Sequence, residues 1–227
     1  MIKFYFSLAP NPIKVALMLE ETGLAYEPIP VDTRKGQQHE PAFKALNPNA
    51  KVPVIVDGDA VVFDSNAILL YLAEKTGQFL TADTLALKGE LFSWLMFIAS
   101  GVGPYSGQSV HFQHFAPEPK DYPIQRYGFE AERHWNILND RLATNEFMVG
   151  DSYTIVDMAV FGWARPLPFI FGEGAMDRFP HIKRLVDWIS ARPAAERVGA
   201  LLATQTFETE MTPEARRALF PSMAEPA

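Results

Sequence analysis

Residues 47–77, NPNAKVPVIVDGDAVVFDSNAILLYLAEKTG, decide the fold of the first part of this chain. Two apolar runs, Val52–Val56 and Ala60–Phe63, flank the turn sequence DGD, and Asp-Gly between apolar runs is a strong signal for a β-hairpin. Apolar residues then share one face of Ser65–Lys75, and Gly77 follows as a helix stop. The stretch therefore predicts two antiparallel strands followed by a helix.

The residues before this stretch predict a strand–helix–strand unit. Strands are expected at Ile2–Phe6 and Glu27–Val31, and two prolines confine the second strand to the edge of a sheet. The segment Ile13–Glu21 carries one apolar face and predicts the helix between them. Asn11 suits the N-cap of that helix, and Pro12 suits its first helical position.

The chain as a whole divides into an α/β part and a helical part. A short helix at Pro41–Leu46 completes the first part, whose element order fits a four-stranded mixed sheet with helices on both faces. After Thr81 the strand signals end, and helices are expected at Leu85–Ser100, Tyr122–Leu142, Ile155–Ala164, His181–Ala191 and Pro213–Leu219, with a break at the glycines and proline of 101–104. The predicted domains are residues 1–80 (α/β) and 86–227 (all-α).

Composition limits the functions that are open to the protein. The 227 residues carry a net charge of −7, which argues against nucleic acid as a partner because phosphate binding needs clustered lysine and arginine. The chain has no cysteine, so it has no disulfide framework and no thiol nucleophile of its own. Any sulfur chemistry must therefore come from a bound ligand.

Other patterns bear on location and on metals. The first residues, MIKFYFSLAP, lack the basic and long apolar regions of a signal peptide. The apolar run around Leu91–Ala99 is shorter than the ~20 residues that a membrane span needs. His111 and His114 have a spacing that could chelate, but no cysteine or paired carboxylate completes a site. We therefore expect a cytoplasmic protein with no membrane partner and no metal.

The segment Lys51-Val52-Pro53-Val54 enters the hairpin and is the first candidate for ligand binding. A cis Val52–Pro53 bond would re-aim the backbone there, and the N–H and C=O of Val52 could then pair with an extended peptide as an added strand would. The alternative is an ordinary trans proline at the start of a strand.

Asp64-Ser65, directly before an apolar helix, is the second candidate. The free N–H groups and partial positive charge of a helix N-terminus suit a carboxylate, to which the Ser65 hydroxyl could also donate. Asp64 could accept from an α-ammonium, so the pair could hold an amino-acid head group. The alternative is a routine helix N-cap.

Residues 7–12, SLAPNP, are the third candidate. A thiol bound there would meet backbone N–H groups and the Asn11 amide, and the pKa of a thiol can fall well below ~8.5 at a helix N-terminus. Ser7 could donate to the same sulfur. The alternative makes Asn11 only a helix cap and Ser7 only the end of a strand.

The order and spacing of these three features resemble the cytosolic glutathione transferases. The stretch 47–77 is similar to the family's glutathione cradle. Thr154-Ile155-Val156-Asp157 is similar to its buried capping motif, in which Thr154 caps a helix and Asp157 reaches back to it. The resemblance covers about residues 1–200. It implies a thioredoxin-like N-terminal domain and an all-helical bundle that forms the second-substrate site.

Three further segments, PNPIKVALMLEE, KGQQHEPAFKALNPNAKVP and GVGPYSGQSVHF, look like the bacterial Nu class. Members of that class are glutathione-dependent disulfide reductases that work without an enzyme cysteine. Where the class has a Thr-Pro-Asn turn facing the glutathione sulfur, this chain has Ala9-Pro10-Asn11 and lacks the threonine hydroxyl. Asp64 stands where the family more often has glutamate, which keeps the charge and shortens its reach.

The resemblance implies roles for individual residues. The implied catalytic residues are Asn11 and Ser7, and the implied glutathione contacts are Gln38, Lys51, Val52, Pro53, Asp64, Ser65 and Arg133. Tyr105 and Gln108 would line the second-substrate pocket. The alternatives are a solvated helix face for Arg133 and loop packing for Tyr105 and Gln108.

The resulting expectation is a homodimeric enzyme that reduces disulfides with glutathione as its co-substrate. A classical transferase that conjugates glutathione to apolar electrophiles is the alternative enzyme. A non-catalytic glutathione-binding module on the same fold is the alternative of a different class, because fold does not fix function.

Overall fold

The computed structural model describes residues 1–80 and 84–221. Contacts divide the chain into two compact units. The first unit contains Met1–Leu72 together with the chain from Ala194 onward, and the second contains Ala73–Pro193. One unit is therefore built from both ends of the chain.

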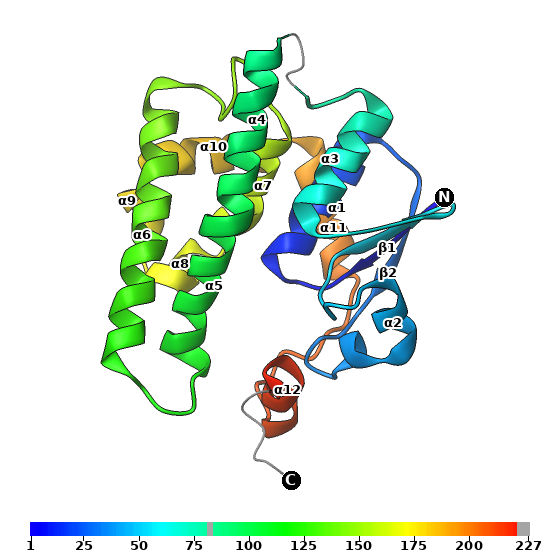
Figure 1. Cartoon of the computed structure of the whole chain (residues 1–227), viewed down its shortest axis with the longest axis vertical. Helices are drawn as coiled ribbons and strands as arrows, with labels where there is room; N and C mark the ends of the chain where they lie inside the picture. The colour runs from blue at the N-terminus through cyan, green and yellow to red at the C-terminus, as the bar shows by residue number, and fades with distance from the viewer. Residues whose placement is uncertain (81–83, 222–227) are drawn as a thin grey trace. The chain divides into compact units, whose positions relative to one another are not determined.

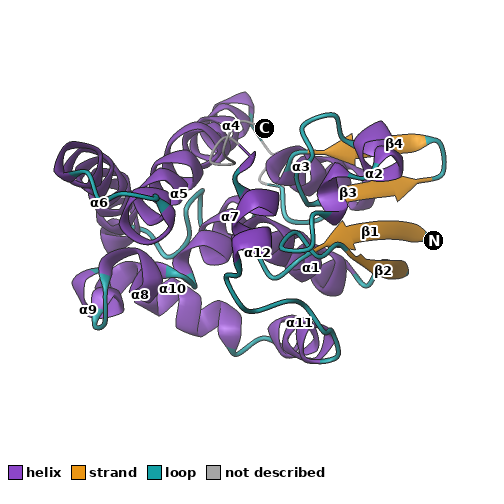
Figure 2. Cartoon of the chain, turned by 90° about the horizontal axis from the view of Figure 1, so that it is seen from below, coloured by secondary structure: helices purple, strands orange, loops and turns teal. Residues whose placement is uncertain are grey.

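The first unit holds a four-stranded sheet in the order β2-β1-β3-β4 (Figures 1 and 2). Strands β1 and β2 are parallel, and the other two pairs are antiparallel. The elements are β1 (Ile2–Phe6), α1 (Pro10–Thr22), β2 (Tyr26–Pro30), a 3-10 turn (Gln37–His39), α2 (Pro41–Leu46), β3 (Val54–Asp57), β4 (Ala60–Phe63) and α3 (Ser65–Thr76). The mixed sheet, the hairpin and the edge position of the proline-containing strand are thereby confirmed.

Alternating side chains of β1 divide the sheet into two covered faces. Phe4 and Phe6 are fully buried and point to one face. Tyr5 points to the other, where its ring meets the Phe43 ring of α2 edge-on, with 6.0 Å between centroids. Figures 1 and 2 show α1 and α3 on one side of the sheet and α2 on the other. The prediction of helices on both faces is confirmed.

Helix α1 begins earlier than the sequence pattern indicated. Its first residue is Pro10 and its N-cap is Ala9, so the prediction of Asn11 as N-cap and Pro12 as first helical residue is wrong. The reason is that Pro10 itself suits the first helical position, where its missing N–H costs nothing. Asn11 therefore lies within the first turn. Gly23 ends the helix in the left-handed conformation, with φ 66°.

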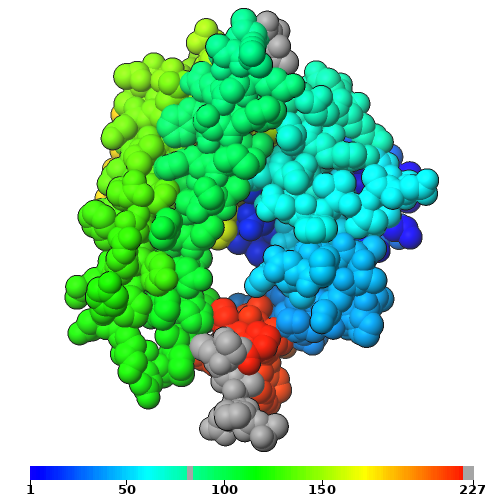
Figure 3. Space-filling view, viewed as in Figure 1, coloured from blue at the N-terminus to red at the C-terminus, as the bar shows by residue number. Residues whose placement is uncertain are grey.

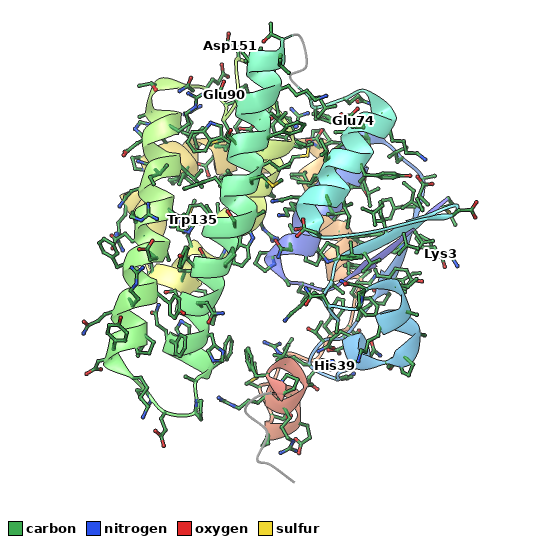
Figure 4. The ribbon with its side chains drawn as sticks, viewed as in Figure 1. Lys3, His39, Glu74, Glu90, Trp135 and Asp151 are labelled. Carbon is green, nitrogen blue, oxygen red and sulfur yellow. The ribbon has the colours of Figure 1, made fainter. Side chains whose placement is uncertain are left out.

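The second unit is a helical bundle. Its α-helices among the described residues are α4 (Leu85–Phe97), α5 (Gly103–Val110), α6 (Asp121–Thr144), α7 (Ile155–Ala164), α8 (Leu167–Phe171), α9 (Ala175–Arg178) and α10 (Pro180–Ser190). Trp135 of α6, labelled in Figure 4, is fully buried and donates its indole N–H to the Ser106 hydroxyl at 3.0 Å. The domain ranges 1–80 and 86–227 stay predictions, and residues 81–83 between them lie outside the described part of the chain.

The glycines at 101 and 103 do not break the helix, contrary to the prediction. A π-helical turn, Ile98–Val102, joins α4 to α5, and a second one, His111–Phe115, follows α5. A Cβ on Gly101 would lie 2.5 Å from the His134 ring. A Cβ on Gly103 would lie 3.2 Å from the Trp163 indole nitrogen. Both glycines thus permit close approach of neighbouring side chains within this bundle.

The resulting continuous helical stretch, Leu85–Phe115, is long and apolar enough to cross a membrane by length and composition alone. The sequence predicted a shorter apolar run, Leu91–Ala99, because it placed a helix break at residues 101–104. One such helix is weak evidence, since core helices of soluble proteins pass the same test. The expected lack of a membrane partner stays a prediction.

Within the first unit, the C-terminal segment packs on the N-terminal part of the chain. Helix α11 (Pro193–Ala203) leads into it, and α12 (Pro213–Leu219) lies beside the 3-10 turn (Figure 3). The Arg34 guanidinium donates to the Glu208 carbonyl, and the Glu208 N–H donates to the Asp32 carboxylate, both at 2.8 Å. The Ala218 carbonyl accepts from Gln38 Nε2 at 3.0 Å. The tail is thereby anchored at Glu208 and at Ala218.

Candidate functional site

The start of α1 gathers the two predicted catalytic residues. Ser7 is buried, and its hydroxyl oxygen accepts from the Ala9 N–H at 3.3 Å, so its proton can still be donated elsewhere. Asn11 lies in the first turn between Pro10 and Pro12, which have no N–H, and the dipole of α1 favours negative charge at this end. This end of α1 can therefore stabilise a thiolate. The role of each side chain stays a prediction.

The loop before β3 contains the predicted backbone site. The Val52–Pro53 bond is cis, as one of the two sequence interpretations had it. Val52 is half-buried and Lys51 is exposed. The Lys51 carbonyl accepts from the Asn47 side-chain amide at 2.7 Å, and the Asn47 oxygen accepts from the Asn49 N–H at 3.0 Å. The buried Asn47 thus holds this loop in place.

The turn between β4 and α3 contains Asp64 and Ser65. Asp64 is exposed and has a left-handed φ of 68°, a conformation that favours glycine and asparagine over most residues. Its Oδ1 accepts from the N–H groups of Asn66 at 2.9 Å and Ala67 at 3.1 Å. Asp64 therefore caps α3, and this capping geometry also presents an exposed carboxylate next to the buried Ser65 at a helix N-terminus.

Gln38 is buried in the 3-10 turn. Its amide nitrogen donates to the Thr33 carbonyl at 3.1 Å and to the Ala218 carbonyl at 3.0 Å. Its amide oxygen is buried without a hydrogen-bond partner among the described residues. An unpaired buried acceptor is costly, so this oxygen is suited to an N–H donor of a ligand. His39, labelled in Figure 4, also contacts the Ala218 carbonyl at 2.8 Å.

Arg133 lies on α6 of the second unit and is engaged by a carboxylate. Arg133 contacts Glu130 at 2.9 Å, and Arg126 binds the same carboxylate. The hydrogen bond from Arg126 and then the one from Arg133 lower the pKa of the Glu130 carboxyl. Two guanidinium groups thus share one negative charge, which leaves excess positive charge for an anionic ligand. Contact of Arg133 with glutathione stays a prediction.

The predicted second-substrate residues lie on α5. Tyr105 is half-buried, with its ring 4.8 Å from the His134 ring, whereas Gln108 is exposed. Phe112 stacks on Tyr127 with 5.3 Å between ring centroids. Packing within the bundle accounts for Tyr105, and the pocket role of both residues stays a prediction. In the described parts of the chain, no group of three or more metal-ligating side chains occurs.

The start of α7 has the capping geometry expected of Thr154 and Asp157. The Asp157 carboxylate accepts from the Thr154 N–H and from the Met148 N–H, each at 2.8 Å, and from the Thr154 hydroxyl at 3.0 Å. Burial raises the pKa of Asp157 to about 6, against the lowering effect of these hydrogen bonds. This cluster supports the bundle.

Sequence reasoning missed four buried polar residues of the first unit, which are Lys14, Asp32, Asn47 and Asn66. The run Asn47-Pro48-Asn49 carried a usable signal, because asparagine before proline is typical of turns in which its side chain bonds the backbone. Lys14 gave no signal, since a lysine in an amphipathic helix is ordinarily assigned to the solvated face.

Residues 1–74 match the glutathione S-transferase N-terminal domain, and residues 116–193 match the glutathione S-transferase C-terminal domain. The disulfide-bond oxidoreductase YfcG of Escherichia coli (strain K12) is 41% identical over 212 residues, covering 90% of this chain and 96% of that protein. The disulfide-bond oxidoreductase YghU of the same organism is 36% identical, covering 86% and 73%.

Solved structures show the same likeness. A glutathione transferase family member from Pseudomonas fluorescens pf-5 with two glutathione bound has 39% identity and a TM-score of 0.81, covering 87% of this chain and 91% of that one. A glutathione transferase from Pseudomonas putida with one glutathione disulfide bound per subunit has 35% identity and a TM-score of 0.79, covering 87% and 90%.

A thioredoxin-like sheet with a cis proline before β3, followed by a helical bundle, defines an enzyme of the glutathione-binding class. The chain belongs to the glutathione S-transferase family. Within that family it is similar to the disulfide-bond oxidoreductases of the Nu type, as the sequence resemblance had indicated.

Proposed function

We propose that this protein reduces disulfides with glutathione as the thiol. The observation that carries the proposal is the absence of cysteine from a chain that is 41% identical to a disulfide-bond oxidoreductase. Since no protein thiol exists, the attacking sulfur must belong to a bound small thiol. The related structures that hold two glutathiones or one glutathione disulfide support glutathione as that thiol.

The proposed reaction uses two glutathiones. The thiolate of the first attacks one sulfur of the substrate disulfide, which forms a mixed disulfide and releases one substrate thiolate that takes up a proton. The thiolate of the second glutathione then attacks the glutathione sulfur of the mixed disulfide. That step releases glutathione disulfide and the second substrate thiol, so two electrons pass from the two glutathiones to the substrate.

The start of α1 would activate the attacking sulfur. Asn11 donates its amide N–H to the thiolate, and the positive end of the α1 dipole lowers the thiol pKa further. Because Ala9 has no hydroxyl, the Ser7 hydroxyl replaces the missing donor. Asp64 and Ser65 would hold the γ-glutamyl end, and Val52 would pair with the cysteinyl backbone.

We further propose a homodimer in the cytoplasm. Exposed apolar side chains support an interface between two copies of the chain. They include Val61 and Phe63 on β4 and Phe92 and Met96 on α4. Light scattering at micromolar concentration checks this, and a monomer would contradict it.

Two assays run side by side test the function. Turnover of hydroxyethyl disulfide with glutathione, coupled to glutathione reductase, is expected to be fast, and conjugation of chlorodinitrobenzene is expected to be weak. Conjugation without disulfide reduction would support the classical transferase instead. Activity in neither assay, together with measurable glutathione binding, would support a non-catalytic binding module.

A further inference from the structure

Lys14 on α1 is a buried cation that the proposed reaction does not use. Its relative exposure is 2%, and it ranks among the largest fully buried side chains of the described residues. Lysine is almost never fully buried unless its ammonium is paired. The neighbours Ile13, Val15 and Leu17 on the same helix are buried and apolar.

The partner of Lys14 lies across the unit, at the start of α3. The Lys14 ammonium donates to Asn66 Oδ1 at 2.5 Å, and Asn66 is itself buried. The N–H of Asn66 donates to Asp64 Oδ1 at 2.9 Å. A chain of hydrogen bonds therefore runs from a buried ammonium to the exposed carboxylate that caps α3.

Packing alone does not explain a lysine at this position. Burial lowers the pKa of Lys14 to about 7, while the negative charge of Asp64, the charged group acting on it, raises that pKa again. Placing an ammonium in an apolar interior costs free energy that a methionine of similar length would avoid. What the lysine supplies is a donor and a positive charge beneath the Asp64–Ser65 turn.

We propose that Lys14 is a positioning residue for glutathione, and that its ammonium form, acting through Asn66, fixes the Asp64–Ser65 turn for the γ-glutamyl head group. This inference rests on the proposed binding of glutathione at that turn. The ammonium holds the Asn66 side chain, and the Asn66 backbone N–H donates to the Asp64 carboxylate. Its charge also favours the α-carboxylate of the ligand next to Ser65.

Loss of the Lys14 proton should therefore weaken binding. Titration calorimetry with S-methylglutathione isolates this effect, because the thioether removes the thiol that would otherwise titrate. From about pH 6 to about pH 8.5 the affinity of the wild-type protein is expected to fall about fivefold, since binding that favours the protonated form must take up a proton.

The variant Lys14→Met supplies the decisive comparison. Its affinity is expected to be about tenfold lower at about pH 6, or about 1.4 kcal/mol, and independent of pH. Its thermal midpoint should be equal to or above that of the wild type, because the buried charge is gone. A lysine with only a structural role would give the opposite pattern, namely lower stability and unchanged affinity.

Two matched variants serve as controls. Lys44→Met removes an exposed lysine on α2 and should keep both the affinity and its pH dependence. His39→Gln removes the imidazole beside Gln38 and should keep the slope. If Lys14→Met does not fold, Asn66→Ala interrupts the same chain and should flatten the wild-type slope.

The outcomes separate this inference from the proposed function. A wild-type affinity that does not change with pH would overturn the positioning role of Lys14 while glutathione binding stands. A Lys14→Met protein with wild-type affinity and slope would do the same. If S-methylglutathione does not bind the wild type at any pH, the proposed function fails, and this inference fails with it.

Discussion

The helix starts at Asp64 and Asp157 use the same chemistry for different purposes. Asp64 precedes α3 and accepts N–H groups of its first turn, whereas Asp157 lies in the first turn of α7 and accepts the N–H of the N-cap Thr154. Asp157 is fully buried and accepts from three donors, so its carboxylate has little left to offer a ligand. Asp64 is exposed and sits in a strained conformation. We propose from this difference that one cap serves stability and the other serves binding.

The largest effect is expected from Asp157→Asn. Asparagine keeps one acceptor oxygen and turns an NH₂ group toward donors that are buried, which leaves them unsatisfied. The free energy of unfolding should fall by about 3 kcal/mol in urea denaturation. Glutathione affinity of the folded fraction should not change. The exposed Asp151→Asn, six residues earlier in the chain, is the matched control. An equal loss of stability there would show that the buried cap contributes no more than an exposed aspartate.

Asn11→Ala addresses a third helix start, that of α1. Turnover with a small disulfide should fall about tenfold, or about 1.4 kcal/mol, because the thiolate loses a donor. Glutathione affinity should stay near the wild-type value, since the predicted ligand contacts at Val52, Asp64 and Ser65 remain. A loss of affinity with unchanged turnover would place Asn11 with the binding residues instead.

Asp64→Ala should reverse the pattern of the Asp157 variant. The KM for glutathione is expected to rise about tenfold, or about 1.4 kcal/mol, while loss of the cap lowers stability by about 1 kcal/mol. Kinetics at saturating disulfide measure the first effect, and urea denaturation measures the second. Asp59→Ala at the exposed hairpin tip is the control. If both variants raise KM equally, the Asp64 turn does not hold the ligand.

The last expected effect is a pH dependence of the stability that Asp157 produces. Its folded-state pKa of about 6 lies above the ordinary value of 3.8. A carboxyl with a raised folded-state pKa contributes stability that is complete below about pH 3.8 and is lost as the pH rises through about 6. The wild type should therefore lose stability between these pH values relative to Asp157→Asn, by at most ~1.4 kcal/mol per pH unit. Parallel pH profiles of the two proteins would contradict this assignment.

The sequence predicted the features that local patterns determine. The hairpin around Gly58, the helix stop at Gly77 and the position of the 154–157 cap each follow from a few neighbouring residues. The cis bond at Val52–Pro53 was one of two open interpretations.

What the sequence did not predict depends on contacts between distant residues. The glycine at 101 suggested a break, yet its lack of a side chain serves the close approach of His134. The burial of Lys14 depends on Asn66, which is 52 residues away. The contact of Gln38 with Ala218 spans 180 residues, and no periodicity reports it.

The anchored C-terminal tail has a consequence for the order in which the protein is completed. A nascent chain emerges from the ribosome N-terminus first, so Asp32, Arg34 and Gln38 emerge well before their partners Glu208 and Ala218. The sheet can therefore form early in translation, but the segment that follows β2 acquires its final hydrogen bonds only after the helical bundle has been synthesised.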